Sequence, residues 1–217
     1  YIDHMGTDLS VVNAARVSFS KTSEWESITP SGPVKGVLKN ADERIINYLA
    51  KHNHWSPFGH ASMQVHIEAP VFVARQLVKH QVGLVWNEVS RRYVDSEPEF
   101  HFVEEWRGSP DNKKQGSSDE VIDISTHIQE DYINMCTYTY RYLLDKGVCP
   151  EQARMVLPQS MMTEWYWSGT LMAFARVCNL RCKEDAQKET QDIAYSIDSL
   201  CRTQFPVSWN ALRNMPT

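Results

Sequence analysis

Residues 40–80 read NADERIINYLAKHNHWSPFGHASMQVHIEAPVFVARQLVKH, and this stretch contains the signals that decide the fold class. Asn40 and Glu43 form a capping-box pattern, and the apolar residues that follow recur at helical spacing through about residue 52. Apolar and polar residues then alternate from Met63 to Glu68, which predicts a half-buried strand. Pro70 suits the first turn of another helix. A helix, a turn, a strand and a helix in this order indicate an α+β domain.

The rest of the chain extends this pattern. Further helices are predicted from Val121 to Gly147, from Pro150 to Leu157, from Thr163 to Asn179 and from Glu184 to Gln204. Val82–Trp86 is predicted as an apolar loop or extended piece, and Glu99–Val103 as a short strand. Residues 107–118 are polar and turn-rich, which predicts a loop. We find no internal repeat or linker, so we expect one α+β domain over residues 1–217, with a short antiparallel β-sheet and a helical C-terminal half.

The bulk composition narrows the class of protein. The 217 residues carry a net charge of -5 and are 42% hydrophobic, which is ordinary for a soluble globular domain. No apolar run approaches the roughly 20 residues that span a bilayer, and no secretory pattern opens the chain. The five cysteines form no CxxC pair, so we expect reduced thiols in a cytoplasmic protein. The acidic balance argues against a general nucleic-acid binder.

Residues 75–93, RQLVKHQVGLVWNEVSRRY, concentrate the groups that could carry chemistry. The segment holds four cations, a histidine, a glutamate, three amides and a serine. Arginine offers a planar fork for phosphate, and amide side chains can read the donor and acceptor pattern of a base. The pattern therefore favours a site for a small, polar, anionic ligand. A solvated amphipathic helix followed by a surface loop is the alternative interpretation.

Several segments resemble, in order, those of the flavin-dependent thymidylate synthases. The family signature is RHR, then seven or eight residues, then S-x-R. Here the corresponding residues are Lys79-His80-Gln81, eight intervening residues, and Ser90-Arg91-Arg92. Other segments that resemble the family are MGTDLSVVNAARVSF, KHNHWSPFGH, APVFVARQ, PEQARMVLP and TEWYWSGTLMAFARVCNLR. The resemblance therefore covers most of the chain.

The resemblance implies a methyltransferase that converts dUMP to dTMP. Members of the family bind FAD and use NADPH and methylenetetrahydrofolate as co-substrates. They are homotetramers whose active sites are assembled at subunit interfaces. The reduced flavin delivers a hydride, and no enzyme cysteine attacks the nucleotide. This sequence agrees with that last property, since it has no Pro-Cys-His nucleophile motif.

The resemblance also implies a role for individual residues. The residues matching dUMP ligands are Gln76, Lys79, Glu88, Ser90, Arg91, Arg92, Arg154 from another subunit, and Arg181. Arg181 is the expected catalytic residue, because a fixed cation beside uracil N3 lowers the pKa of that nitrogen. The residues matching FAD ligands are Ser18, Ser56, Lys79, His80, Gln81, Asn87, Glu88, Thr170 and Arg176. His54 matches a histidine where folate approaches. We expect no metal site, because the histidines lack an HExxH or similar ligand set.

Some positions depart from the family pattern and leave alternatives open. RHR is replaced by Lys79-His80-Gln81, which keeps one flanking charge and loses the other. Thr170 and Arg176 stand where some relatives use Asn for flavin contacts. We therefore expect FAD to bind with altered contacts. The alternatives are a flavin enzyme that makes hydroxymethyl-dUMP, a nucleotide-binding homologue without catalysis, and a nucleic-acid-binding module.

Overall fold

The structure is a computed structural model that describes residues 1–27, 36–111, 116–125 and 127–214. The described chain divides into two compact units. Unit 1 comprises Tyr1–His66, His80–Val85 and Trp167–Thr217, and unit 2 comprises Ile67–Lys79 and Trp86–Tyr166. Each unit is therefore assembled from segments that are distant in sequence. A single domain over residues 1–217 stays a prediction.

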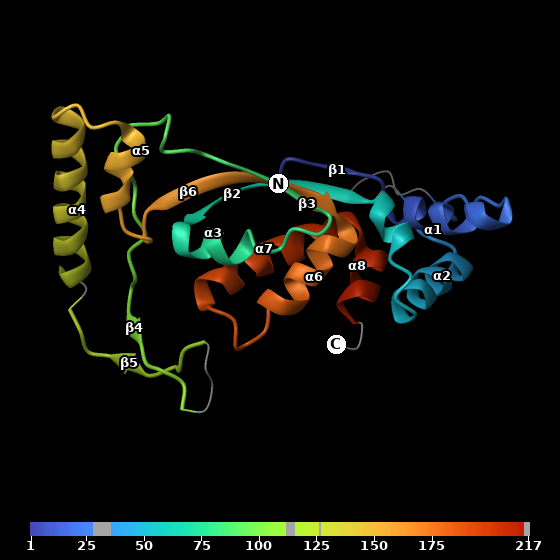
Figure 1. The fold of residues 1–217 in the computed structure, drawn as a ribbon. Coiled ribbons are helices and arrows are strands. Elements are labelled where there is room, and N and C mark those ends of the chain that lie inside the picture. Colours follow the sequence, from blue (N-terminus) through green and yellow to red (C-terminus); the bar gives the residue numbers. More distant parts are fainter. Residues whose placement is uncertain (28–35, 112–115, 126, 215–217) are drawn as a thin grey trace. The chain divides into compact units, whose positions relative to one another are not determined.

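Short strands are interspersed with helices along the described chain, and its last three elements are helices (Figure 1). Unit 1 contains β1 (Asp3–Met5), α1 (Asp8–Arg16), η1 (Val17–Phe19), α2 (Asn40–Lys51), η2 (Ser56–His60), α6 (Leu171–Arg181), α7 (Lys188–Gln204) and α8 (Pro206–Arg213). Unit 2 contains α3 (Val71–Leu77), β4 (Trp106–Arg107), β5 (Val121–Ile122), α4 (His127–Asp145), α5 (Pro150–Ala153) and η3 (Arg154–Val156). Three strands contribute residues to both units: β2 (Ser62–Pro70), β3 (Leu84–Glu88) and β6 (Met162–Thr170).

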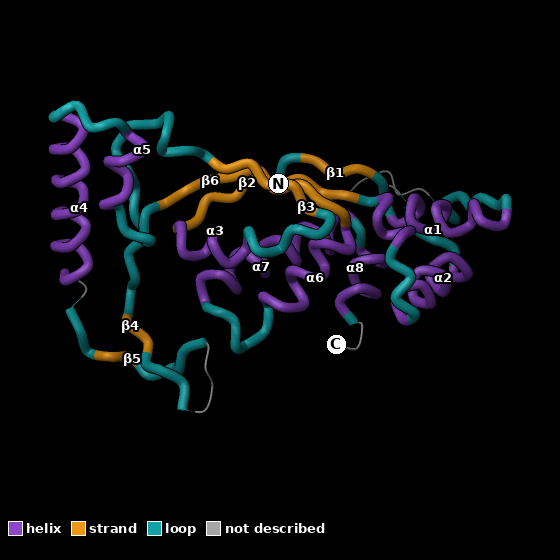
Figure 2. The backbone as a smooth tube through the Cα atoms, viewed as in Figure 1, coloured by secondary structure: helices purple, strands orange, loops and turns teal. Residues whose placement is uncertain are grey.

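The main sheet has the strand order β1-β2-β6-β3, and Figure 2 shows β2 and β6 running side by side. β1 pairs antiparallel with β2, with Asp3 opposite Gln64. Along β2, Met63, Val65 and Ile67 are buried, which confirms the half-buried strand predicted from the alternation. The mixed α+β fold with a small antiparallel sheet, predicted from the sequence, is therefore confirmed.

The helix predicted over 163–179 is wrong in its first part. Residues 162–170 form β6, and the helix α6 begins only at Leu171. Along β6, Thr163, Trp165 and Trp167 are buried, whereas Glu164 and Tyr166 are exposed. This period of two belongs to a strand, and large aromatic residues pack well on a pleated sheet.

The core of unit 1 lies among its C-terminal helices. α6 packs against α7 and α8, and α2 packs against α8. Trp167 and Phe174 meet edge to face in this core, with ring centroids 5.3 Å apart. The buried Asp8 accepts hydrogen bonds from the backbone N–H groups of Val207 at 3.0 Å and Ser208 at 2.8 Å. These bonds satisfy two N–H groups at the start of α8 and tie it to the start of α1.

Unit 2 departs from the sequence-based expectation in two places. The helix predicted from Val121 begins at His127, because Val121–Ile122 form β5. The residues 99–103 form no strand, and Phe100 makes only a single bridge with Met161. The segments 99–103 and 121–122 are each too short for the local sequence pattern to show which other strand they pair with.

The spacing of the apolar residues does not show which face of α4 is buried. Its buried residues are Ile133, Cys136 and Tyr140, and the helix packs against α5 and η3. Ile128, Tyr132, Met135 and Tyr142, which are spaced by three, four or a sum of these, are exposed. A helix with apolar residues on two sides does not reveal from its spacing alone which side faces the core.

The other predicted helices agree with the structure apart from their ends. α2 occupies the predicted range, and α3 begins directly after Pro70. α3 ends at Leu77, so the basic residues that follow lie beyond the helix and do not continue its exposed face. The last predicted helix begins at Lys188 and is followed by the separate α8. None of the helices in the described residues is long and apolar enough to cross a bilayer.

Candidate active site

Arg181 and His80 form a pair in unit 1. Arg181 is the last residue of α6, and His80 follows α3 in the chain. Arg181 Nε donates a hydrogen bond to His80 Nε2 over 3.1 Å. Because a guanidinium can only donate, His80 Nε2 carries a lone pair and the imidazole is neutral, with its proton on Nδ1. Burial and the charge of Arg181 lower the pKa of His80, and burial also lowers the pKa of Arg181.

The segment 80–85 is fixed at the other end of α6 by Thr170 and Gly83. Thr170 Oγ1 accepts a hydrogen bond from the backbone N–H of Ala173 at 3.2 Å and so caps α6. The backbone N–H of Thr170 donates to the carbonyl of Gly83 at 3.0 Å. Gly83 has φ +78, and a Cβ there would lie 3.1 Å from Thr170 Oγ1. This glycine therefore allows a close approach that other residues would not, and Thr170 serves first as a helix cap.

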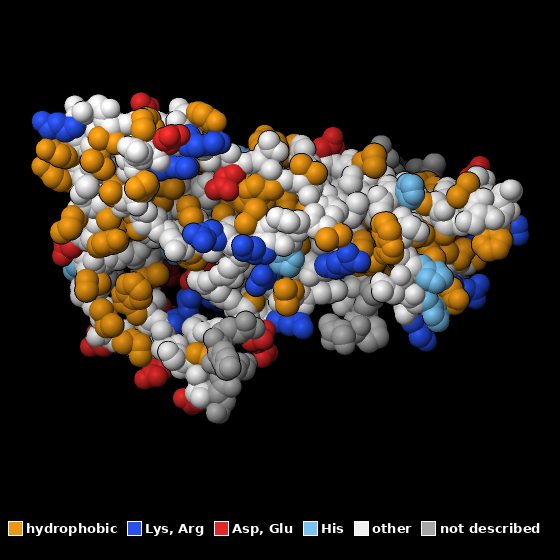
Figure 3. Space-filling model, viewed as in Figure 1, with side chains coloured by type: hydrophobic (Ala, Val, Ile, Leu, Met, Phe, Trp, Pro, Cys, Tyr) orange, Lys and Arg blue, Asp and Glu red, His pale blue; other side chains and the backbone are white. Residues whose placement is uncertain are grey.

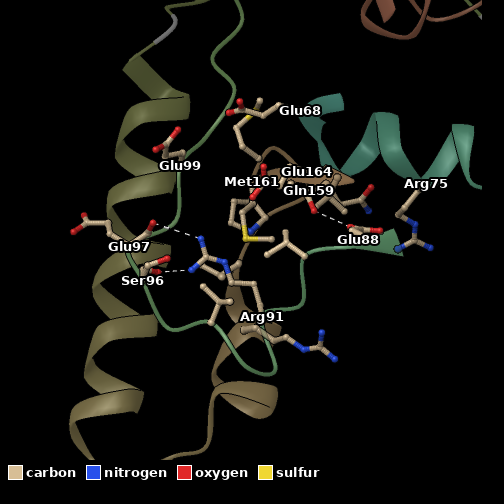
Figure 4. Close-up of a pocket in the computed structure, with 18 residues that line it drawn as sticks. Glu68, Arg75, Glu88, Arg91, Ser96, Glu97, Glu99, Gln159, Met161 and Glu164 are labelled. Carbon is tan, nitrogen blue, oxygen red and sulfur yellow. Dashed lines mark hydrogen bonds between the residues drawn. The ribbon is translucent and has the colours of Figure 1, made fainter. Parts of the chain in front are cut away.

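A polar hollow of about 610 Å³ lies in unit 2 (Figure 4). Its cations are Arg75 on α3, Arg91 in the loop after β3, and Arg154 at the start of η3. Five carboxylates line the same hollow, at Glu68, Glu88, Glu97, Glu99 and Glu164. Residues from the two segments 75–93 and 154–164 therefore meet here within one chain, whereas the resemblance implies that Arg154 contributes from another subunit.

Glu88 is held in this hollow by two donors. Thr163 Oγ1 donates to Glu88 Oε1 at 2.8 Å, and Trp86 Nε1 donates to Glu88 Oε2 at 3.1 Å. The indole of Trp86 stacks on Trp165, with ring centroids 4.3 Å apart. A carboxylate with each oxygen fixed still has lone pairs for a ligand hydroxyl or N–H. Glu88 is thus a preorganised acceptor.

In the S-x-R element, Arg91 holds the backbone of a loop, whereas the side chain of Arg92 is exposed. Arg91 donates to the backbone carbonyls of Ser96 and Glu97, the latter at 3.4 Å, and so holds the loop after β3. Ser90 Oγ accepts from Arg92 Nε at 3.1 Å. The Arg92 guanidinium lies 4.9 Å from the ring centroid of Tyr93, which is the geometry of a cation–π contact.

The structure distributes the remaining candidate residues over both units. Gln76 is half-buried on α3, and Lys79, Gln81, Asn87 and Arg176 are exposed. Ser18, His54 and Ser56 line a second hollow in unit 1, formed by α1, η1, α2 and η2. We find no cluster of metal-ligating side chains among the residues that the structure describes.

Two kinds of site residue were not predicted from the sequence. Arg75 lines the hollow of unit 2 but was not assigned as a ligand, although it lies in the segment that concentrates the cations. Lys21, Arg44 and Trp55 line the second hollow. No motif in the sequence connects these three residues, because only the packing of α1 on α2 and η2 brings them together.

Comparison with known proteins identifies the family. The family model described as "Thymidylate synthase complementing protein" matches residues 1–207. A flavin-dependent thymidylate synthase of Kosmotoga olearia is 35% identical and covers 98% of this chain and 88% of its own. The corresponding protein of Thermus thermophilus is 34% identical and covers 97% of this chain and 73% of its own. The chain belongs to the flavin-dependent thymidylate synthase family. The sequence-based prediction of a methyltransferase enzyme is thereby confirmed.

Solved structures agree with this assignment. The UMP/dUMP methylase PolB from Streptomyces cacaoi, bound with 5-Br dUMP, is 25% identical, with a TM-score of 0.79. That match covers 99% of this chain and 93% of the PolB chain. The same protein bound with 5-Br UMP gives a TM-score of 0.75 at 26% identity. The fold of this flavin-dependent thymidylate synthase family member is therefore similar to that of a solved nucleotide methylase.

Proposed function

We propose that this enzyme converts dUMP to dTMP, with methylenetetrahydrofolate as carbon donor, NADPH as reductant and FAD as its bound cofactor. Relatives named flavin-dependent thymidylate synthase and a methylase solved with 5-Br dUMP support the nucleotide and the flavin. Because the signature is altered to Lys79-His80-Gln81, the alternative product hydroxymethyl-dUMP is one of the outcomes that the product assay distinguishes.

The proposed mechanism depends mainly on one geometric observation. Arg181 is half-buried, and its Nε lies 3.1 Å from Nε2 of the neutral His80 imidazole. A partly desolvated cation interacts more strongly with a developing anion than one in water does. Beside uracil N3, Arg181 stabilises the ring anion, lowers the pKa of N3 and increases the nucleophilicity of C5. An activated C5 can attack the donor carbon directly, so no sulfur nucleophile is required.

The hollow of unit 2, taken by itself, offers groups that suit a nucleotide. Arg154 and Arg75 supply fork-shaped donors for the phosphate, and Ser90 adds a hydroxyl. Arg91 positions the loop that presents Ser90 and Arg92. Glu88 offers fixed carboxylate oxygens to a ribose hydroxyl or to a ring N–H, and Gln76 can pair with the base. Arg154 already lines this hollow within one chain, so the phosphate contact proposed here does not require the Arg154 of another subunit.

The residues of unit 1 also fit a flavin. His80 has its proton on Nδ1, which is a donor for a ring carbonyl or nitrogen, and Gln81 and Arg176 are exposed donors. Gly83 and Thr170 keep the intervening backbone close to α6. Bound FAD would supply the hydride that completes the methyl group. The further proposed FAD ligands are Lys79, Asn87, Glu88, Ser18 and Ser56, and His54 lies where folate is proposed to approach.

The proposed mechanism uses no thiolate nucleophile, and the cysteines differ in how readily they would form a thiolate. Burial raises the pKa of Cys201, and a hydrogen bond with Cys182 together with burial raises the pKa of Cys178. The reciprocal bond lowers the pKa of the half-buried Cys182, which makes this thiol the one to test. We expect Cys182→Ser to keep its turnover, and loss of turnover with normal folding would argue for a cysteine mechanism. Five free thiols also fit the proposed cytoplasmic location.

The deciding experiment is a product assay with FAD, NADPH and methylenetetrahydrofolate, in which dUMP and UMP are compared as substrates. Mass analysis separates dTMP from hydroxymethyl-dUMP. We expect Arg181→Ala to keep its flavin and to lose about 10²- to 10³-fold in turnover, the usual loss for a preorganised charge. Lys188→Ala, an exposed change on α7, serves as the control. Full turnover in Arg181→Ala would remove this residue from the mechanism.

The homotetramer remains part of the proposal. Exposed apolar side chains gather on α4, at Ile128, Tyr132, Met135, Tyr138 and Tyr142, and Figure 3 shows hydrophobic side chains over this helix. Contiguous exposed apolar residues are typical of a protein–protein interface. Light scattering of the wild type and of Met135→Glu tests this role, and a monomeric wild type would contradict it.

A further inference from the structure

Three cysteines of unit 1 lie in the region where α6, α7 and α8 pack against one another (Figure 1). Cys178 is on α6, Cys182 directly follows the end of this helix, and Cys201 is on α7. The proposed mechanism uses none of these thiols. A group of nucleophilic side chains therefore remains without a role.

Cys178 and Cys182 lie next to each other across the last turn of α6. The backbone N–H of Cys182 donates to the carbonyl of Cys178 at 3.0 Å, which closes this turn. A hydrogen bond also joins the two thiols, because side chains four positions apart share one face of a helix. At this spacing the two Cα atoms are about 6 Å apart, within the range that a disulfide bridges.

The two thiols differ in their access to solvent. Cys182 is half-buried, so part of it is open to a small reagent, whereas Cys178 is fully buried. Sγ of Cys178 also lies 3.5 Å from the carbonyl oxygen of Ala194 on α7, to which it can donate. An accessible cysteine beside a second, protected cysteine is the arrangement of many redox-sensing pairs.

The groups around Cys182 favour its thiolate form. The hydrogen bond from Cys178 lowers the pKa of the Cys182 thiol, and the charge of Arg213 lowers it further, whereas burial and the charge of Asp198 oppose them. Arg213 is held in place, because its Nε donates to Asp198 at 2.5 Å and its other donors include one bonded to Asn179. Since the thiolate is the nucleophile, Cys182 is the more reactive of the pair.

We propose that Cys182 and Cys178 form a modification site for hydrogen peroxide, in which Cys182 is oxidised first and Cys178 then closes a disulfide. In the first step the Cys182 thiolate attacks one peroxide oxygen, so that an S–O bond forms, the O–O bond breaks and hydroxide leaves with its electron pair. In the second step the Cys178 sulfur attacks the sulfenic acid, and its proton leaves with the hydroxyl group as water. The two sulfurs are oxidised and one peroxide is reduced, so the electrons balance.

The disulfide changes the end of α6 that carries Arg181. Cβ atoms four residues apart on a helix are about 5–6 Å apart, but a disulfide requires about 3.5–4.5 Å. The bridge therefore draws Cys182 toward Cys178, and Cys182 can move because a turn follows it. Arg181 immediately precedes Cys182, so its 3.1 Å hydrogen bond to His80 is lost. The resulting loss of turnover rests on the proposed function, whereas formation of the disulfide does not.

The test treats the purified enzyme with hydrogen peroxide and locates the product by mass spectrometry. Wild type should lose two of its five thiols and gain a bridge between Cys178 and Cys182. Cys182→Ser should form no bridge, and Cys178→Ser should stop at a sulfenic acid on Cys182 that dimedone traps. Cys149→Ser is the matched control, because it removes an exposed thiol of unit 2, and it should form the bridge as wild type does.

The second readout is dTMP formation before peroxide, after peroxide and after reduction with dithiothreitol. We expect oxidation of the wild type to lower turnover about 10- to 100-fold, the effect of a small misplacement of a catalytic group, and dithiothreitol to restore it. Cys182→Ser should keep its turnover throughout.

Two results of the mass measurement would overturn the proposal: no bridge in the wild type, or a bridge between Cys178 and Cys201 instead. Unchanged turnover of the bridged enzyme, or an equal loss in Cys182→Ser, would overturn the displacement of Arg181. Because the bridge is detected without turnover, a protein that forms it but makes no dTMP when reduced refutes the proposed function and supports this site.

Discussion

The hydrogen bond from Arg181 to His80 predicts a specific pH-dependent role for the imidazole. His80→Leu removes the acceptor, whereas His80→Gln keeps an oxygen that can accept from the guanidinium. A charge-assisted hydrogen bond contributes about 1.5–3 kcal/mol, and partial exposure of both groups reduces this to about 1–2 kcal/mol. We therefore expect His80→Leu to lose about 5- to 30-fold in kcat/KM for dUMP and His80→Gln to recover most of this loss.

The pH profile distinguishes this positioning role from a merely structural one. The pKa of His80 is lowered from 6.5 by burial and by Arg181, so the pair is intact at pH 7 and is lost as pH falls through the lowered value. Over this window the unfolded chain binds more protons than the native one, so the free energy of unfolding also decreases as pH falls. The assay is kcat/KM against pH for the wild type and both variants, with His127→Gln as an exposed control. An acid limb that persists unchanged in His80→Gln, or a fully active His80→Leu, would refute the reasoning.

Two further predictions concern the two hollows. Arg154→Gln should raise the KM for dUMP about 10-fold, the cost of one charge-assisted phosphate contact, while flavin absorbance stays normal; an unchanged KM would exclude Arg154 from the phosphate site. Asp42 is fully buried and accepts from Arg16 and from Ser23 Oγ, so Asp42→Ala should lower the free energy of unfolding in urea by about 3 kcal/mol. A loss below about 1 kcal/mol would show that Arg16 relaxes into solvent.

Local sequence pattern predicted those elements whose two faces differ clearly. In α2 and β2, apolar residues recur with one period only, and both elements were predicted close to their observed bounds. Residues 162–170 were predicted as the start of a helix because their aromatic residues suit either a strand or a helix. Gly169 is the one Gly or Pro near the boundary between β6 and α6, so little in the sequence marks this boundary. In α4, apolar residues lie on several sides, so the buried face depends on where α5 and η3 pack.

By itself the sequence determined the fold class, the family and most of the residue types from which the candidate sites are built. These follow from periodicity and from motifs, which depend on neighbours in the chain. Only the tertiary structure decided that Arg181 bonds His80, which is 101 positions away, and that Lys21, Arg44 and Trp55 surround one hollow. Such contacts join residues that are distant in sequence, so they depend on how the whole chain folds. The pattern of neighbouring residues does not show which distant residues will meet.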